Sequence, residues 1–323
     1  MNISARNLLV YLHRLIERAA FYGVLFTLAG LFGRYHWFLE LFAHFKLQLA
    51  GCFVGYTLIE IAARHRHHAT VGAVFALANV LPVVMLCLPA THQPPPTVSA
   101  PVAQLRILQA NILTSNRDAA ALLGLIEREA PDVIVLQETN LRWLNDLAVL
   151  TNAYPVFAAM PREDNFGAAI YCKTNAQTAE IIYLDVLDAV PSTRAHLTVN
   201  GRPLTVIGTH PFAPYNRAHW LGRNQHMQRL APLVRDVTGP CVVTGDFNAT
   251  PWTASFRTFL ADSGLRDSAR GRCLQPTWPA FLPPFMRIPL DHALHSPDVH
   301  VVARRLGPSI GSDHLPVILD VAF

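Results

Sequence analysis

The chain has 323 residues, which is enough for one large domain and a smaller module. Hydrophobic residues make up 51% and charged residues only 15%, against roughly 25% charged residues in an average soluble domain, so some segment is unusually apolar. Most of the net charge of +4 comes from the first third; the remainder is almost neutral, which gives no support for a strongly basic nucleic-acid-binding surface.

The first ninety residues contain one clear candidate for a membrane span and two weaker ones. Residues 69–90 carry no charged side chain and, at ~1.5 Å per residue in a helix, are long enough to cross ~30 Å of hydrocarbon. Residues 19–33 are uncharged but short, and the apolar stretch 47–61 has Glu60 near its end. A buried core helix is the alternative for residues 69–90, but the length of the segment favours a membrane span.

The basic residues favour three spans over two. Arg6, Arg14 and Arg18 mark the N-terminus as cytoplasmic, and the basic segment 64–68 marks the connection before the last span as cytoplasmic too. Both conditions hold only if two spans separate the two basic segments. We therefore expect a transmembrane region over residues 1–90, a cytoplasmic N-terminus, and a main domain outside the cytoplasm.

The histidine cluster and the cysteines of the chain are interpreted as structural. The histidines at positions 65, 67 and 68 have metal-ligating side chains, but a basic membrane flank is the simpler interpretation. Five cysteines do not form a disulfide framework; a single bridge is possible but is not the favoured interpretation. Cys273 lies in a predicted loop, and four cysteines are predicted to be small core residues: Cys52, Cys87, Cys172 and Cys241.

A proline-rich linker over residues 91–103 separates the apolar region from a domain that begins at residue 104. Residues 105–111 predict a strand that ends in Asn111, and Asn116 is a candidate N-cap for a helix that extends to about Ala130. Residues 132–138 predict a second buried strand that ends in Glu138. A strand, a helix and a strand with polar residues at both strand ends indicate an α/β domain.

The rest of the domain continues this alternation. Asn200-Gly201 is a strong hairpin signal, so part of the sheet is antiparallel. A helix over about 218–237 precedes the run Cys241–Asp246, which predicts a buried strand, and a short helix over about 253–263 follows it. Further strands are predicted at residues 165–172, 195–199 and 203–210.

Six apolar segments end in polar residues that are suited to phosphate chemistry. Asp246 and Asn248 follow Gly245 at the end of one strand, where a carboxylate beside an amide could activate water and donate to an anion. Taken alone, this pattern is also typical of a turn, and Glu138 alone could be a surface strand end. Near the C-terminus, Asp291 precedes His292 and Asp313 precedes His314; either pair alone could be an exposed loop, and His292 is expected to face away from Asp291.

All six motifs in this order resemble the endonuclease/exonuclease/phosphatase superfamily, over roughly residues 104–323. The motifs are Gln109-Ala-Asn111, Leu136-Gln-Glu138, Gly208-Thr-His210, Gly245-Asp-Phe-Asn248, Leu290-Asp291 and Ser312-Asp-His314. The apolar N-terminal region and Thr277-Trp-Pro279 look like a bacterial membrane-anchored subgroup. The resemblance implies a four-layer α/β sandwich, in which two mixed β-sheets pack face to face with helices outside.

The resemblance also implies a role for each polar residue. Glu138 would be the main ligand of Mg²⁺, for which Mn²⁺ could substitute, with Asn111 and Asp313 completing or supporting the metal site. Asp246 would orient and deprotonate the attacking water, and Asn248 would donate to the phosphoryl oxygens.

The two histidines of the motifs would act on the phosphate. Asp291 would orient His314 and keep it protonated for phosphate binding. His210 would contact the phosphate or help to protonate the leaving oxygen. The neighbourhood of Arg162 and Asn165 would either touch substrate or be an ordinary loop.

The function expected from the sequence is a Mg²⁺-dependent phosphodiesterase, anchored in a bacterial inner membrane and acting outside the cytoplasm. Its substrate would be a nucleic acid or a phospholipid or phosphoinositide headgroup, and the near-neutral domain argues against a dedicated nuclease. Abasic-site repair is disfavoured because those enzymes carry tyrosine in the region of His210. A catalytically inactive binding module is the alternative from another class, and the presence of Glu138, Asp246 and His314 argues against it.

Overall fold

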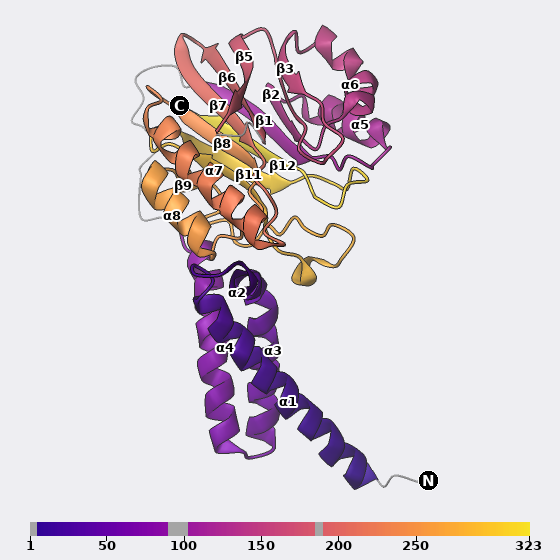
Figure 1. Cartoon of the computed structure of the whole chain (residues 1–323), viewed down its shortest axis with the longest axis vertical. Coiled ribbons are helices and arrows are strands. Elements are labelled where there is room, and N and C mark those ends of the chain that lie inside the picture. Colours follow the sequence, from indigo (N-terminus) through magenta and orange to yellow (C-terminus); the bar gives the residue numbers. More distant parts are fainter. Residues whose placement is uncertain (1–4, 90–102, 185–189) are drawn as a thin grey trace. The chain divides into compact units, whose positions relative to one another are not determined.

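The computed structural model describes residues 5–89, 103–184 and 190–323, and these residues form two compact units, Met1–Leu86 and Cys87–Phe323. The expected proline-rich linker lies outside the described residues, except for Ala103. The two units are described separately below (Figure 1).

The first unit is helical. It contains α1 (Ala5–Leu31), α2 (Trp37–Leu41), a 3-10 turn η1 (Phe42–Phe45), α3 (Lys46–Ala62) and α4 (Arg66–Cys87). Two segments, Trp37–Ala62 and Arg66–Cys87, are long and apolar enough to cross a membrane. The expected additional span over residues 19–33 forms the second half of α1 and is not among them, because its apolar stretch is short and the first half of the helix carries several charges.

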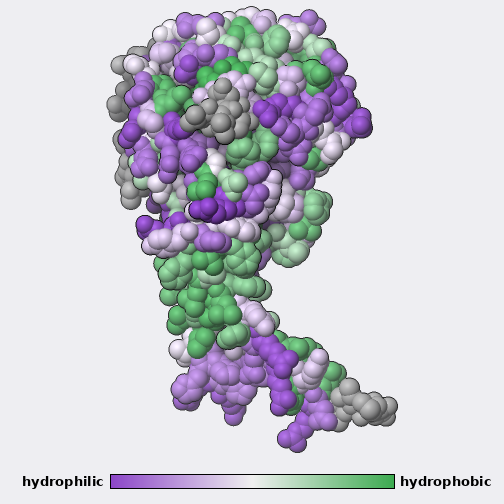
Figure 2. Space-filling model, viewed as in Figure 1, coloured by the Kyte–Doolittle hydropathy of each residue, from purple (hydrophilic) through white to green (hydrophobic). Residues whose placement is uncertain are grey.

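The surface of the first unit is apolar in the middle of the helices and polar at the end where α3 meets α4 (Figure 2). Large apolar side chains such as Leu58 and Leu77 are more than 60% exposed. In the interior, Phe53 packs against Gly23, and Lys46 donates a 3.2 Å hydrogen bond to Asn79, which donates in turn to Thr27. These three buried polar side chains are therefore paired, while many large apolar side chains lie on the outside.

The second unit is built on two six-stranded mixed sheets. The first sheet has the order β11-β12-β1-β2-β4-β3, and only β1 and β2 within it run parallel. The second has the order β5-β6-β7-β8-β10-β9, with β7 and β8 parallel. The strands of the first sheet are β1 (Gln104–Asn111), β2 (Val133–Gln137), β3 (Val156–Met160), β4 (Ala168–Cys172), β11 (His300–Leu306) and β12 (Val317–Ala322). Those of the second are β5 (Ala176–Tyr183), β6 (Pro191–Val199), β7 (Arg202–Thr209), β8 (Cys241–Asp246), β9 (Arg266–Asp267) and β10 (Asp291–His295).

Helices cover the outer face of each sheet, so the expected four-layer sandwich is confirmed. Over the first sheet lie α5 (Ala119–Glu129) and α6 (Leu141–Asp146), whose Leu122 and Trp143 pack onto the strands. Over the second sheet lie α7 (Arg217–Arg235) and α8 (Ala254–Ser263), through Leu230 and Phe256. A central layer of fully buried side chains, among them Val135 and Val206, joins the two sheets. The short 3-10 turns are η2 (Ala148–Asn152) and η3 (Pro284–Met286).

Several local predictions are confirmed and others are corrected. The hairpin at Asn200-Gly201 joins β6 to β7, with both residues at positive φ. The helix expected after Asn116 begins later, with Asp118 as its N-cap. The sequence patterns missed α6, the interior strand β12 and the edge strands β3, β5, β9 and β11. Edge strands such as β3 and β5 are only half buried and lack a continuous apolar run.

The cysteines differ from the prediction in two respects. Cys172 and Cys241 are buried as expected, but Cys52 is exposed. Cys87, at the end of α4 and the start of the second unit, forms a disulfide with Cys273. The two cysteines are 186 residues apart, so no local pattern in the sequence could reveal the pair.

Candidate active site

The strand ends of both sheets bring the predicted site residues together. Asn111 ends β1 and Glu138 directly follows β2, and because these strands are parallel neighbours their polar ends lie at the same edge. Asp246 ends β8 and pairs in register with Asp291, the first residue of antiparallel β10. His210 directly follows β7, the parallel neighbour of β8. The topology therefore explains why residues far apart in the sequence meet.

The backbone at these strand ends has conformations that are rare for ordinary residues. Glu138 and Asn248 have positive φ values of 63° and 49°. Gly245 has φ 153°, and a Cβ atom there would lie 1.9 Å from the carbonyl oxygen of Thr209. Such conformations concentrate at functional sites, where the surrounding structure holds them in place. The glycine before Asp246 is therefore required by the close approach of β7.

Asp246 is at the centre of the polar contacts. Its Oδ2 atom lies 3.4 Å from Nε2 of His210 and 3.5 Å from Nε2 of His314, and it accepts a 3.2 Å hydrogen bond from Nδ2 of Asn111. Its Oδ1 atom accepts a 2.9 Å hydrogen bond from the backbone N–H of Asn248. Only 1% of Asp246 is exposed, so these contacts fix its carboxylate.

A second carboxylate holds His314 from the other side. Nδ1 of His314 lies 2.8 Å from Oδ2 of Asp291, whose Oδ1 accepts a 2.9 Å hydrogen bond from Nε2 of Gln109. The Gln109 contact joins the first sheet to the second. Ser312 adds another connection, since its hydroxyl donates to the carbonyl of Asn111 and accepts from the backbone N–H of His314. His314 is therefore fixed by both sheets.

These contacts determine the charge of the buried groups. Burial alone would lower the pKa of His314, but the carboxylates of Asp291 and Asp246 raise it to about 10. Burial also opposes the charge on His210, and the bond to Asp246 outweighs it, so the pKa of His210 is raised. Burial would raise the pKa of Asp246, but His314 and His210 hold it well below the usual range. The site therefore contains an ionised Asp246 beside a protonated His314, and beside a His210 whose protonated form is favoured.

Glu138 has the environment expected of a ligand for a hard cation. Its carboxylate accepts a 2.9 Å hydrogen bond from Asn111 Nδ2 and a 3.2 Å bond from the backbone N–H of Thr114. These described partners are neutral, so they do not compensate the carboxylate charge. Asp313 receives a 3.0 Å hydrogen bond from Trp278 on Oδ2, and its Oδ1 is buried with no described hydrogen-bond partner. Carboxylates whose described hydrogen-bond partners are neutral donors fit Mg²⁺ or Mn²⁺.

Asp246, Asp291 and His314 also present atoms within 4.8 Å of one another, a spacing that could hold a metal ion. Their contacts have a simpler explanation, because a protonated His314 between two carboxylates already compensates their charge. The group can therefore be an ion-paired network, and Glu138 is a separate candidate metal ligand.

The remaining predicted residues lie around this centre in different ways. The side-chain amide of Asn248 donates a 3.0 Å hydrogen bond to the carbonyl of Pro211, next to His210. The guanidinium of Arg162 pairs with Asp164. Asn165 has φ 67° and precedes Phe166. His292 faces away from the site, as expected, and binds the carbonyl of Ala249 beneath Phe256.

An aromatic wall beside His210 was not predicted from the sequence. The ring of Phe166 lies 5.8 Å from that of His210 and 4.8 Å from that of Phe212. Phe212 also contacts the ring of His219, whose centroid lies 4.2 Å from that of the exposed Tyr215 ring, with the two planes tilted by 52°. These residues come from two separate loops and the first turn of α7, so only the fold brings them together. Gln109 was also missed as a contact of Asp291, because its position in a strand motif does not reveal a partner in the other sheet.

A two-sheet α/β sandwich with acids, amides and histidines at its strand ends defines a class of phosphoester hydrolases. A sequence model of the "Endonuclease/Exonuclease/phosphatase family" matches residues 108–314, which includes every strand-end motif described above. The chain therefore belongs to this family, whose members are hydrolases of phosphoesters. A comparison with curated protein sequences found no significant match.

Solved structures with similar folds include three from different organisms. The human Nocturnin catalytic domain with a bound sulfate anion is 22% identical, with a TM-score of 0.56 over 68% of this chain and 94% of that chain. D. rerio TDP2 complexed with a single-strand DNA product is 18% identical, with a TM-score of 0.55 over 68% of this chain and 98% of that chain. A family protein from Bacteroides thetaiotaomicron is 19% identical, with a TM-score of 0.54 over 69% and 99%. At these identities the similarity establishes the fold.

Proposed function

We propose that the chain is a membrane-anchored, Mg²⁺-dependent phosphodiester hydrolase. The observation that supports this most directly is the buried Asp246 carboxylate, which contacts His210, His314 and the amide shared with Glu138. Phosphodiester hydrolysis requires a carboxylate that activates water and cationic groups that donate hydrogen bonds to the phosphate. It also requires an acidic residue that binds a metal cation.

Each residue has a defined part in this reaction. Asp246 stays ionised, so it accepts a hydrogen bond from the attacking water and takes its proton as the new bond to phosphorus forms. His314 and His210 donate to phosphoryl oxygens as negative charge builds, and His210 can protonate the leaving oxygen. Glu138 would hold Mg²⁺, with Asn111 and Asp313 supporting it, and the bound cation would neutralise the non-bridging oxygens. The Asn248 amide would support the phosphoryl group beside His210.

Removal of the carboxylate of Asp246 tests this mechanism. We expect Asp246→Ala to lower the turnover of bis-p-nitrophenyl phosphate by roughly 10²–10⁴-fold. EDTA should abolish the activity of the wild type, and Mg²⁺ or Mn²⁺ should restore it. Asp262→Ala, which removes an exposed acid on α8, is the matched control and should keep full activity. Equal activity in the Asp246 variant and the control would contradict the mechanism.

The aromatic wall favours nucleic acid as substrate. Stacking on exposed rings is the main way in which proteins hold single strands, at about 1–3 kcal/mol per base. Tyr215 is 62% exposed and Phe166 is adjacent to His210, so a base next to the scissile phosphate could stack there. D. rerio TDP2, which has the same fold, is complexed with a single-strand DNA product in its solved structure.

An exposed apolar loop favours the second candidate, a phospholipid headgroup. Phe281 and Phe285 are 79% and 67% exposed, and Met286 is 46% exposed. The loop is connected to the site, because the backbone N–H of Ala280 donates to the carbonyl of Asp313. Exposed aromatic side chains next to a phosphate site could enter the surface of a bilayer.

Two variants of the full chain separate these substrates. If the substrate is nucleic acid, Tyr215→Ala should reduce cleavage of single-stranded DNA or RNA by roughly tenfold. If it is lipid, the double substitution Phe281→Ser and Phe285→Ser should reduce hydrolysis of sphingomyelin or phosphatidylinositol in vesicles to a similar extent. Each variant should leave the hydrolysis of soluble bis-p-nitrophenyl phosphate unchanged. The substrate whose turnover falls selectively is the supported one.

The proposed location is a bacterial inner membrane, with several spans, a cytoplasmic N-terminus and the second unit outside the cytoplasm. Two apolar helical segments, the exposed apolar side chains of the first unit and the flanking basic residues support this placement. The Cys87–Cys273 disulfide also supports it, because disulfides persist mainly in oxidising compartments.

A further inference from the structure

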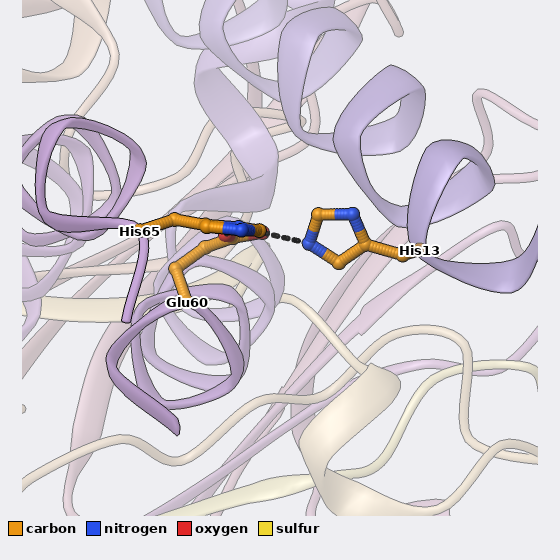
Figure 3. Close-up of side chains that lie close together, drawn as sticks. All are labelled: His13, Glu60 and His65. Carbon is orange, nitrogen blue, oxygen red and sulfur yellow. Dashed lines mark hydrogen bonds and ion pairs between the residues drawn. The ribbon is translucent and has the colours of Figure 1, made fainter. Parts of the chain in front are cut away.

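The first unit contains a cluster of metal-ligating side chains at one end of its helices. His13 and Glu17 come from α1, Glu60 from the end of α3, His65 from the turn between α3 and α4, and His68 from α4. Nε2 of His13 lies 2.9 Å from Oε1 of Glu60, and Nδ1 of His65 lies 2.9 Å from Oε2 of the same carboxylate (Figure 3). Three separate segments therefore point metal-binding atoms at one position.

Glu60 is the residue that makes this cluster unusual. Its side chain has 0% exposure, and burial of an isolated carboxylate is costly unless a positive charge compensates it. The described ion-pair partners of Glu60 are the histidines at positions 13, 65 and 68. A bound cation would compensate the carboxylate directly, with the neighbouring imidazole nitrogens as further ligands.

We propose that His13, Glu60 and His65 bind a divalent transition metal ion of the zinc class, with Glu17 and His68 as additional ligands or supports. Imidazole nitrogen and carboxylate oxygen are typical zinc ligands, whereas Mg²⁺ and Ca²⁺ prefer oxygen alone. The ligand atoms of the three residues lie within 4.8 Å of one another. Ligand atoms around a tetrahedral ion with bonds of ~2.0–2.1 Å are separated by about 3.3 Å, so only small side-chain movements are needed.

Glu17 and His68 lie at the edge of this cluster and could complete the coordination of the ion. Nδ1 of His68 lies 3.2 Å from Oε1 of Glu17, which is also 3.8 Å from Nδ1 of His13. Glu17 and His68 could therefore supply a fourth ligand or hydrogen-bond to the ligating residues, as the partners of metal-bound histidines commonly do. The histidine cluster in the sequence thus acquires ligands from α1 and α3 that the sequence alone did not connect to it.

This site is separate from the catalytic centre. All of its residues belong to the first unit, and the candidate ligands of the catalytic cation belong to the second. In the proposed topology it lies at the cytoplasmic end of the helices, so it would take its metal from the cytoplasm. A bound ion would join α1 to the α3–α4 pair.

The test is metal binding by the full chain in detergent, with Glu138→Gln included in every variant to remove the main catalytic ligand. We expect one Zn²⁺ per chain to resist gel filtration, and Co²⁺ to give the visible absorption of a tetrahedral site with nitrogen and oxygen ligands. His13→Ala, His65→Ala and Glu60→Gln should each weaken Zn²⁺ binding by roughly tenfold or more in competition with a chelating dye. His67→Ala is the matched control, because this exposed histidine lies outside the cluster and its loss should not change binding.

Folding is checked independently of metal binding. The same substitutions in the chain that retains Glu138 should leave Mg²⁺-dependent phosphodiesterase activity unchanged. If Glu60→Gln fails to fold, His65→Ala carries the test, since that side chain is half exposed. Zn²⁺ binding of equal affinity in the His13, His65 and His67 variants, or no Zn²⁺ retained by the parent chain, would overturn the proposal and leave the cluster as an ion-pair network.

Discussion

At the scale of single residues, the side chain and backbone of His314 are both held by specific contacts. It lies between two carboxylates, and its backbone is held by the hydroxyl of Ser312. Deep burial opposes its charge, yet the two acids raise its pKa to about 10. The site therefore keeps a permanent positive charge where a phosphate would bind, rather than one that titrates near neutral pH.

The raised pKa of His314 predicts how stability depends on pH. A histidine whose pKa rises on folding, here from 6.5 to about 10, contributes stability that is complete below pH 6.5 and is lost as pH rises towards 10. Asp291→Asn removes one of the two acids, so its destabilisation relative to the wild type should be largest at pH 6. By pH 10 the difference should shrink by at least about 1.4 kcal/mol, the equivalent of one pKa unit. Thermal unfolding in EDTA measures this, and a difference that is constant with pH would contradict it.

At the scale of elements, the end of β8 sets the position of Asp246. Gly245 allows the backbone to pass the carbonyl of Thr209, and the register of β8 with β10 places Asp246 opposite Asp291. Asn248 then has positive φ, which lets its N–H turn back onto Asp246. Three features of the backbone therefore act together at one strand end.

A pair of glycine substitutions tests this account of β8. Gly245→Ala puts a Cβ atom into the β7 backbone at φ 153° and should destabilise the catalytic unit by about 2 kcal/mol or more. Gly124→Ala is the matched control: nothing lies within 4 Å of a Cβ atom at that helical position, so it should stabilise by up to about 1 kcal/mol. Thermal unfolding of both variants measures the difference. Equal unfolding temperatures would show that Gly245 is not constrained.

The parts of the fold that the sequence could predict are those with strong local signals. The central strands β1, β2, β7 and β8 are largely buried and lead directly into polar residues, and these segments supplied most of the site. The edge strand β5 is partly exposed along its length and has no such signal. The aromatic wall, the Gln109–Asp291 bond and the ligands that join the histidine cluster all depend on residues far apart in the chain. Their pairing is a property of the topology, so no local pattern reveals it.

At the scale of the whole molecule, the Cys87–Cys273 disulfide relates the membrane topology of the chain to the oxidation state of two cysteines. Cys87 ends α4, the helix that contains the clearest candidate span, and Cys273 lies in a loop of the catalytic unit. A cytoplasmic catalytic unit would keep both thiols reduced. The oxidation state of this pair therefore reports on which side of the membrane the unit lies.

Two measurements in cells check the proposed topology. An alkaline phosphatase reporter joined through a flexible spacer after Phe323 should be active, because the reporter would lie outside the cytoplasm. The spacer is needed because Phe323 is only 3% exposed. The wild type should also migrate faster without reductant than with it, and Cys87→Ser should remove this difference. A silent reporter together with free Cys87 and Cys273 thiols would place the catalytic unit in the cytoplasm.

The two ends of the catalytic unit are side by side. The N–H of Ala103 donates to the carbonyl of Phe323, and the N–H of Phe323 donates back to Ala103, so the first and last described residues of the sandwich close a single pair of antiparallel strands. A short peptide could therefore connect Phe323 to Ala103 without a change in the fold of the sandwich. A circular permutant that joins these ends and opens elsewhere should preserve the catalytic centre. For the same reason, an anchor attached after Phe323 would join the sandwich at nearly the same point as one attached before Ala103. Either end of the sandwich could therefore be used to immobilise the protein.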